Sequence, residues 1–259
     1  MLLALDVGNT ETTVGLFRGD HLEILWRLTT RSHRTPDEWA AALTAYLTQA
    51  GRSTQEVRAA IIASVVPQVT PALREAVQRA TTVPPTVVDA RSPLPIRLDV
   101  DEPLTVGADR IVNTLAAAQL FKHDTIVVDF GTATTFDCIT ADGRFIGGVI
   151  MPGVQTASDD LVRKAAKLPA TELTAPERVI GRRTEDCIRA GVLFGTAEAV
   201  DGLVRRIKAE WPDGRVPRTV ATGGLAGLIA PLTRAIESVH PDLTLVGLRI
   251  AAQALGLRW

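Results

Sequence analysis

Two copies of one short pattern constrain the fold of this chain more than any other feature. The first copy is LLALDVGNTETTVGLF, centred on Asp6, and the second is TIVVDFGTATTFDCIT, centred on Asp129. In each copy an apolar run rich in β-branched residues ends in Asp, followed by Gly, small polar side chains and renewed apolar alternation. A turn signal follows at the same offset, at 18–20 and at 141–143. The pattern predicts three strands joined by two turns, used twice.

The turn after the first strand is a candidate phosphate-binding loop in both copies. Glycine lets backbone amides approach a ligand closely, and neighbouring hydroxyls donate hydrogen bonds without crowding it. Either copy alone is compatible with an ordinary hairpin. Because the pattern recurs with a matching downstream turn, we interpret the loops as binding the phosphates of one nucleotide from both sides, with Asp6 and Asp129 available for cations.

Helix and strand patterns alternate after the first copy, which favours two similar halves. Strands are expected at 58–65 and 86–89, helices from a capping box at 35–38, from 70 to about 80 and from 107, and a loop at 91–103. We therefore expect an α/β protein of two duplicated βββαβα halves, residues 1–118 and 119–259, with a nucleotide cleft between them.

Composition excludes several classes of function. A net charge of −1 and a pI near 6.4 give no electrostatic footprint for nucleic acid or an anionic membrane. No apolar stretch approaches the roughly 20 residues of a membrane span, and Asp6 interrupts the first apolar run, which reads as a strand and not as a signal peptide. Cys138 and Cys187 are too few for a disulfide framework, so a reducing cytoplasm is expected.

The chain lacks the common nucleotide-binding fingerprints. It has neither G-x-x-x-x-G-K-[ST] nor G-x-G-x-x-G, so it is not a P-loop enzyme or a Rossmann dinucleotide binder by motif. A glycine pair, Gly223-Gly224, lies between a short strand and a helix. Such a pair allows a base or a ribose to lie against the backbone, although a plain turn fits the pattern equally well.

Asp109 is the candidate general base. Phosphoryl transfer needs cations on the phosphates, an in-line acceptor and a base near the acceptor hydroxyl. Asp109 lies at a predicted helix start, where the macrodipole favours its ionised form, and Arg110 offers a planar cation for an acidic substrate. Asn113 lies one turn later on the same face. The alternative is a helix cap beside a surface ion pair, but the preceding Gly107 and the two other aspartates favour catalysis.

The order of five motifs resembles the type III pantothenate kinases over essentially the whole chain. These are DVGNT at 6–10, GADR at 107–110, DFGTATT at 129–135, GGVIMPG at 147–153 and TGG at 222–224, followed by TLVGLR at 244–249, which resembles the family's close. The first and third motifs alone would indicate only the actin-like ATPase and sugar-kinase fold. GADR, at its place between the two phosphate loops, is the specific element.

The resemblance implies an ATP- and Mg²⁺-dependent kinase that phosphorylates pantothenate, the first step toward coenzyme A. The residues implied to bind ATP are Asp6, Val7, Gly8, Asn9, Thr10, Glu11, Thr12, Thr13, Thr132, Gly223 and Gly224, with Asp6 on the magnesium side. Those implied to hold pantothenate are Gly107, Ala108, Asp109, Arg110 and Thr184, with Asp109 as proton acceptor and Arg110 near the carboxylate. Asp129 is implied to bind a monovalent cation, K⁺ or NH₄⁺.

The resemblance also implies a homodimer, in which Thr184 reaches the substrate of the other subunit. A role for Thr184 as a helix N-cap fits the sequence equally well. The chain departs from the family at Val100, where a Tyr that lines the pantothenate pocket is often found. Two alternatives remain open: a kinase for another small acid or a sugar, or a phosphatase, on the same fold; and a non-catalytic accessory factor for transcription.

Overall fold

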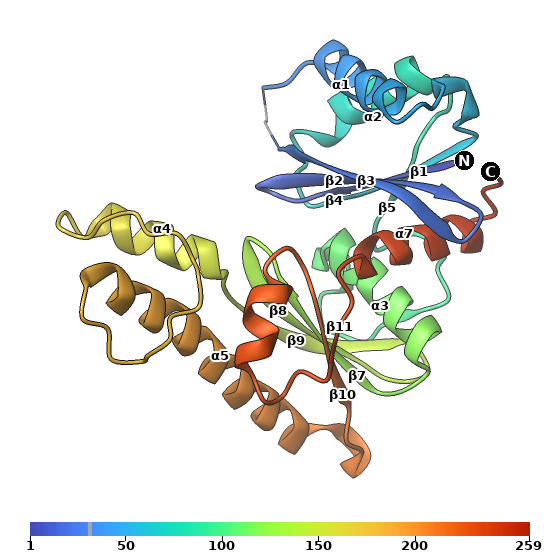
Figure 1. Ribbon diagram of the computed structural model, residues 1–259. Helices are drawn as coiled ribbons and strands as arrows, with labels where there is room; N and C mark the ends of the chain where they lie inside the picture. The colour runs from blue at the N-terminus through green and yellow to red at the C-terminus, as the bar shows by residue number, and fades with distance from the viewer. Residues whose placement is uncertain (31–32) are drawn as a thin grey trace. The chain divides into compact units, whose positions relative to one another are not determined.

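The structure is a computed structural model that describes residues 1–30 and 33–259 (Figure 1). Its internal contacts divide the chain into two units. Unit 1 comprises Met1–Ala116 and Leu243–Trp259, and unit 2 comprises Ala117–Asp242. The division expected from the sequence, 1–118 and 119–259, differs in the last segment, which packs with unit 1. The reason is the apolar face of its helix, described below.

The sheet of unit 1 has the strand order β3-β2-β1-β4-β5. Its strands are β1 (Leu2–Val7), β2 (Glu11–Arg18), β3 (His21–Thr29), β4 (Ala59–Ser64) and β5 (Thr86–Val88). β1, β2 and β3 are antiparallel neighbours, whereas β4 and β5 continue the sheet in parallel from β1. The repeated sequence pattern therefore forms the antiparallel part, and the helix–strand alternation forms the parallel part.

Helices cover both faces of this sheet (Figure 1). One face carries α1 (Pro36–Gln49) and α2 (Thr70–Thr81), and the other carries α3 (Ala108–Phe121) and α7 (Leu243–Ala254). Side chains alternate along β1, so that Leu3 and Leu5 pack with α1 and α2, while Leu2 and Ala4 pack with α3 and α7.

The predicted capping box starts α1. Thr35 Oγ1 accepts a hydrogen bond from the Glu38 N–H at 3.3 Å, and the Thr35 N–H donates to Glu38 Oε2 at 2.7 Å. From this start Trp39, Leu43 and Leu47 fall on one helical face and are buried. The expected strands at 58–65 and 86–89 and the expected helix from 70 are confirmed to within one or two residues.

Unit 2 repeats this topology. Its strands are β7 (Thr125–Phe130), β8 (Ala133–Ile139), β9 (Arg144–Pro152), β10 (Arg218–Thr222) and β11 (Ser238–Val239). β7, β8 and β9 are antiparallel neighbours, and β10 and β11 extend the sheet in parallel from β7. The two units thus carry the same arrangement of strands, which confirms the predicted duplication.

The helices of unit 2 are α4 (Val154–Lys164), α5 (Thr184–Glu210) and the short α6 (Ala226–Ile229). Leu193 and Val200 of α5 pack with alternate residues of β7, namely Val128 and Phe130, so Asp129 faces the opposite side of the sheet.

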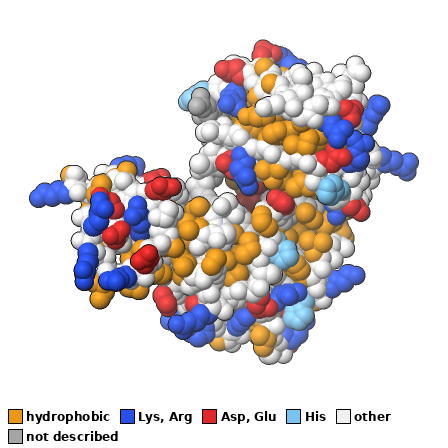
Figure 2. All heavy atoms as spheres, in the orientation of Figure 1, with side chains coloured by type: hydrophobic (Ala, Val, Ile, Leu, Met, Phe, Trp, Pro, Cys, Tyr) orange, Lys and Arg blue, Asp and Glu red, His pale blue; other side chains and the backbone are white. Residues whose placement is uncertain are grey.

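Several short elements complete the chain. They are the strand β6 (Arg97–Leu98), which lies in the segment expected to be a loop, and the 3₁₀ helices at Thr54–Glu56, Pro103–Thr105, Pro212–Gly214 and Ala230–Leu232. In the described residues no helix has the length and apolar character needed to cross a membrane. On the face drawn in Figure 2, acidic and basic side chains are interspersed over both units, in keeping with the near-neutral net charge.

Candidate active site

The first predicted phosphate loop is a tight turn between β1 and β2. The Gly8 N–H donates to the Glu11 carbonyl at 3.0 Å, and a Cβ at Gly8 would lie 3.0 Å from that oxygen. The glycine therefore leaves the turn compact, with Asn9 and Thr10 exposed. Buried Thr12 shares a 2.8 Å hydrogen bond with Thr30, which fixes the strand behind the loop.

Asp6 lies at the carboxyl end of β1, opposite Thr13 of β2. Since side chains alternate along β1, Asp6 shares the face of Leu2 and Ala4, which is the face that carries α3. Asp6 is half-buried. The loop thus lies at the carboxyl edge of the sheet, where ligands of open α/β sheets bind. The Asp6 carboxylate lies on the face of the sheet that carries α3.

Asp109 lies in the first turn of α3, as predicted. The Gly107 carbonyl accepts the first helical hydrogen bond, from the Ile111 N–H at 3.1 Å, and Asp109 Oδ1 accepts from the Arg110 N–H at 2.7 Å. A Cβ at Gly107 would lie 2.5 Å from Asp109 Oδ1 and 3.3 Å from a methyl group of Val65. Gly107 therefore makes the room that the carboxylate occupies.

Val65, next to Gly107, connects the start of α3 to the sheet of unit 1. Val65 directly follows β4, and its N–H donates to the Val7 carbonyl at 3.1 Å, at the end of β1. Asp6 and Gly107 are thus both tied to the carboxyl ends of the neighbouring parallel strands β1 and β4. Local packing in unit 1 brings the first phosphate loop and the candidate base to the same edge of one sheet.

The electrostatics of Asp109 differ from the sequence expectation. Burial raises the pKa of the Asp109 carboxyl above its ordinary value, and this effect exceeds the opposing influence of the Arg110 N–H and guanidinium. Desolvation of the Asp109 carboxyl therefore outweighs the helix start, which favours the ionised form. A carboxyl with a raised pKa is a better proton acceptor than a fully solvated one.

The second phosphate loop connects β7 and β8. The Gly131 N–H donates to the Ala133 carbonyl at 3.1 Å, and the exposed Thr132 carries a carbonyl that accepts from the Gly153 N–H at 3.2 Å and from Thr156 Oγ1 at 2.7 Å. A Cβ at Gly153 would overlap the carbonyl oxygens of Gly131 and Thr132. The last glycine of GGVIMPG is thus required for the start of α4 to pack against this loop.

The glycine pair predicted to receive the nucleoside lies beside this second loop. Thr222, the last residue of β10, pairs with Asp129 of β7, and Gly223 follows with φ +92°. A Cβ at Gly223 would overlap Asp129 Oδ1 and lie 2.6 Å from the Phe130 nitrogen, whereas a Cβ at Gly224 would meet no atom within 4 Å. The carboxyl ends of β7 and β10 therefore bring Asp129 and the glycine pair together within unit 2.

The oxygen atoms around each aspartate suit hard cations. Strand pairing places Thr13 beside Asp6, and places Thr135 and Thr222 on either side of Asp129. Thr222 Oγ1 is buried and has no hydrogen-bond partner among the described residues. Carboxylate and hydroxyl oxygens are ligands that Mg²⁺ and similar cations accept. Among the residues described, no group of three or more His, Cys, Asp or Glu side chains could hold a metal, so phosphate oxygens would have to complete either site.

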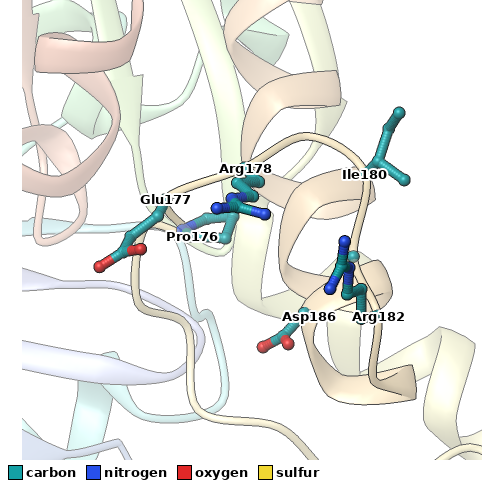
Figure 3. Close-up of a pocket in the computed structure, with 7 residues that line it drawn as sticks. Pro176, Glu177, Arg178, Ile180, Arg182 and Asp186 are labelled. Atoms are coloured by element: carbon teal, nitrogen blue, oxygen red, sulfur yellow. The ribbon is translucent and has the colours of Figure 1, made fainter.

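Thr184 is the first residue of α5 and is exposed. The N-cap position belongs to Arg183, which makes no side-chain capping bond, so the N-cap interpretation of Thr184 is wrong. Just before it, the chain from Pro176 to Arg182 arches beside the start of α5 and lines an open hollow of about 290 Å³ (Figure 3). The sequence of this segment has no helical or strand periodicity.

The strand arrangement and the repeated Asp-Gly loops define the class: the actin-like ATPase and sugar-kinase fold. The activator of the 2-hydroxyisocaproyl-CoA dehydratase from Clostridium difficile matches with a TM-score of 0.58 and 14% identity, over 99% of this chain and 93% of that one. The ROK hexokinase from Thermus thermophilus matches with a TM-score of 0.52 and 15% identity, over 97% of each chain. These likenesses establish the fold.

Sequence comparison identifies the family within this class. The family model described as type III pantothenate kinase matches residues 2–206. The type III pantothenate kinase of Thermomicrobium roseum is 46% identical over 255 residues, covering 98% of each chain, and that of Moorella thermoacetica is 44% identical over 252 residues, covering 96% of this chain and 98% of the other. The chain belongs to the type III pantothenate kinase family.

Proposed function

We propose that this protein transfers the γ-phosphoryl group of ATP to the hydroxyl of pantothenate, giving 4′-phosphopantothenate, the first step of coenzyme A biosynthesis. Family membership over nearly the full chain supports the substrate. The observation that carries the chemistry is Asp109, half-buried at the start of α3 beside a glycine that leaves room for its carboxylate.

Asp109 would accept the proton of the acceptor hydroxyl as the new P–O bond forms and the bond from the γ-phosphorus to the β–γ bridging oxygen breaks, releasing ADP. Its pKa, raised by burial, moves toward the working pH, where a general base is most effective. Arg110, the next residue of GADR, would pair with the pantothenate carboxylate through its planar guanidinium. Gly107 and Ala108 would complete this substrate-binding segment.

The two glycine loops would hold ATP. Backbone N–H groups of tight turns bind phosphate oxygens, and the exposed hydroxyls of Thr10 and Thr132 would add to them. The residues proposed to contact ATP are 6–13, Thr132 and the pair Gly223 and Gly224. When bound at Asp6, Mg²⁺ offsets the charge of the phosphates, and a monovalent cation, K⁺ or NH₄⁺, would do so at Asp129.

The active protein would be a homodimer in which Thr184 contacts the substrate bound to the other subunit. Its exposure at the start of α5, with no capping role, leaves its hydroxyl available for such a contact. A cytoplasmic location follows from the reaction proposed. Val100, half-buried after β6, would replace one side chain of the pantothenate pocket and affect affinity more than turnover.

Two alternatives keep the fold and change the function: a kinase acting on another small acid or a sugar, or a non-catalytic accessory factor for transcription. The chain retains Asp6, Asp109, Arg110 and Asp129, which a non-catalytic factor would have no need to keep. The deciding experiment measures ATP turnover with pantothenate and with a panel of sugars and small hydroxy acids, with and without potassium. Turnover dependent on pantothenate supports the proposal, and turnover with another acceptor alone, or with none, contradicts it.

A further inference from the structure

The C-terminal helix α7 packs directly against α3, the helix that begins with GADR. Both helices lie on the same face of the unit 1 sheet. Residues of α7 and α3 share one apolar cluster: Leu245, Leu248, Ala251 and Ala252 from α7, and Ile111, Val112 and Leu115 from α3. The TLVGLR run at 244–249, which the proposed function does not use, supplies Leu245 and Leu248 to this contact.

Two contacts fix α3 against α7. A Cβ at Gly247 would overlap the Val112 carbonyl oxygen and lie 3.1 Å from Val112 Cβ, so only glycine allows the helices to approach this closely. Thr244 Oγ1 donates a hydrogen bond to Asn113 Oδ1 at 2.9 Å, and Asn113 is only 1% exposed. Thr244 and Gly247 are three residues apart and therefore share one face of α7.

α7 is itself held on its other sides. Leu245 lies where Gly15 of β2 has no side chain, since a Cβ there would be 2.9 Å from a Leu245 methyl. Farther along the helix, Arg249 Nη1 and Gln253 Nε2 donate to Asp20 Oδ1, at 2.5 Å and 3.1 Å. α7 is thus fixed to β2 and to the turn between β2 and β3, which belong to the same hairpin repeat as the first phosphate loop.

We propose that Thr244 and Gly247 are positioning residues for phosphoryl transfer, which set the placement of the Asp109 carboxylate through α3. The close contact at Gly247 fixes the distance between the helices, and the directional Thr244–Asn113 hydrogen bond fixes the rotation and axial position of α3. Asp109 lies one helical turn before Asn113, so a rotation of α3 moves it directly. The inference rests on the proposed role of Asp109 as the proton acceptor.

The test compares Thr244→Val, which deletes the hydroxyl and keeps the shape, with Thr244→Ser, which restores the hydroxyl. Thr81→Val is the matched control, because Thr81 Oγ1 is buried in the same unit but makes only local hydrogen bonds, donating to the Val77 carbonyl at 2.7 Å and accepting from the Val83 N–H at 3.3 Å. We expect Thr244→Val to lower kcat about 10- to 100-fold, as a small misplacement of a catalytic group does. The KM for ATP should stay within about twofold, and Thr244→Ser and Thr81→Val should keep a near-normal kcat.

A second measurement needs no substrate. Hydrogen exchange of the Arg110 and Ile111 amides reports the order of the first turn of α3, and we expect it to be about tenfold faster in Thr244→Val only. Folding is checked by urea unfolding, and Thr244→Ala replaces the valine variant if that does not fold. Unchanged exchange of these amides in Thr244→Val overturns the inference, whatever its kcat. If the wild type is active, an unchanged kcat in Thr244→Val overturns it as well. If the wild-type protein never phosphorylates pantothenate, that result rejects the proposed function alone, and faster exchange in Thr244→Val still supports the link between α7 and α3.

Discussion

Gly107 and Asp109 share one small space: a Cβ on the glycine would lie 2.5 Å from Oδ1 of the carboxylate. The backbone of Gly107 has no positive φ, so its lack of a side chain, and not its conformation, is what the site requires. The atom that a larger residue would displace is the end of the Asp109 side chain. Substitution there should move the candidate base while the fold stays in place.

Gly107→Ala should therefore separate activity from stability. We expect kcat to fall about 10- to 100-fold as the carboxylate rotates away, while the free energy of unfolding changes by no more than about 1 kcal/mol. The control is Gly191→Ala on α5, where a Cβ meets no atom within 4 Å. Steady-state kinetics and urea unfolding on both variants check this. A Gly107→Ala enzyme with normal kcat would show that the position of Asp109 is unimportant.

Asp109→Asn should keep the fold and lose turnover, since the amide has the shape of the carboxylate but cannot accept the proton. Loss of a positioned base costs roughly 100- to 10,000-fold. The measurement is kcat for pantothenate phosphorylation, with circular dichroism to confirm the fold. Near-normal turnover of the folded variant would reject Asp109 as the base.

The raised pKa of Asp109 predicts that the wild type and Asp109→Asn differ in how their activity and their stability depend on pH. Wild-type kcat/KM should fall as the pH drops through the folded-state pKa, above the ordinary value of 3.8. Stability follows the opposite sense: because folding raises this pKa, the contribution is fully present below the unfolded pKa and is lost as the pH rises through the folded one. Urea unfolding should therefore show wild type losing stability relative to Asp109→Asn between acid and neutral pH, and an equal dependence in both would contradict the assignment.

Gly223→Ala and Gly224→Ala should behave differently although the residues are adjacent. Gly223 has φ +92° and faces the Phe130 backbone, so alanine there should cost about 1–3 kcal/mol and raise the KM for ATP. Gly224 has open space around its Cβ position, and its alanine variant should stay within about 0.5 kcal/mol of wild type. Thermal unfolding and ATP titration measure both, and equal stability of the two variants would contradict the packing of Gly223 against Asp129.

The cation proposal predicts that turnover needs magnesium and rises steeply when sodium is replaced by potassium or ammonium. The chain has no P-loop lysine, so metal ions must offset the charge of the transferred phosphoryl group. Asp129→Asn should flatten the response to potassium while the response to magnesium persists. Titrating each cation against wild type and variant tests this, and equal wild-type rates in sodium and potassium would count against it.

The shared-site proposal for Thr184 is tested by subunit exchange between two inactive proteins, Asp109→Asn and Thr184→Trp. Because Thr184 is exposed, we expect the larger side chain to cost little folding stability. If Thr184 serves the partner's site, each mixed dimer has one doubly damaged site and one undamaged site, so about a quarter of all sites should recover after random exchange. Activity that stays at the mutant background after verified exchange would reject the shared site.

Features that depend on neighbours along the chain could be predicted from the sequence. Local periodicity, turn chemistry and helix capping predict the strand–turn–strand repeat around Asp6 and Asp129, the capping box at Thr35 and the start of α3 within one residue of Gly107. These signals act over a few residues, and the structure reproduces each of them. The order of the motifs along the chain also indicated the family, because this order is a property of the sequence and does not depend on the fold.

The sequence did not predict which surfaces pack against one another in the folded chain. The packing of Leu243–Ala254 with unit 1 depends on Gly247 against Val112, residues distant in sequence whose contact no local pattern specifies. The packing of Gly223 against Asp129 likewise follows from no local pattern. Nor does the raised pKa of Asp109, because the effect of burial exceeds the effect of the helix start, which is the influence that the sequence indicates. Close packing and desolvation depend on atoms from distant parts of the chain that folding brings together. The contacts and the pKa shift that they cause can therefore be determined only from the folded structure.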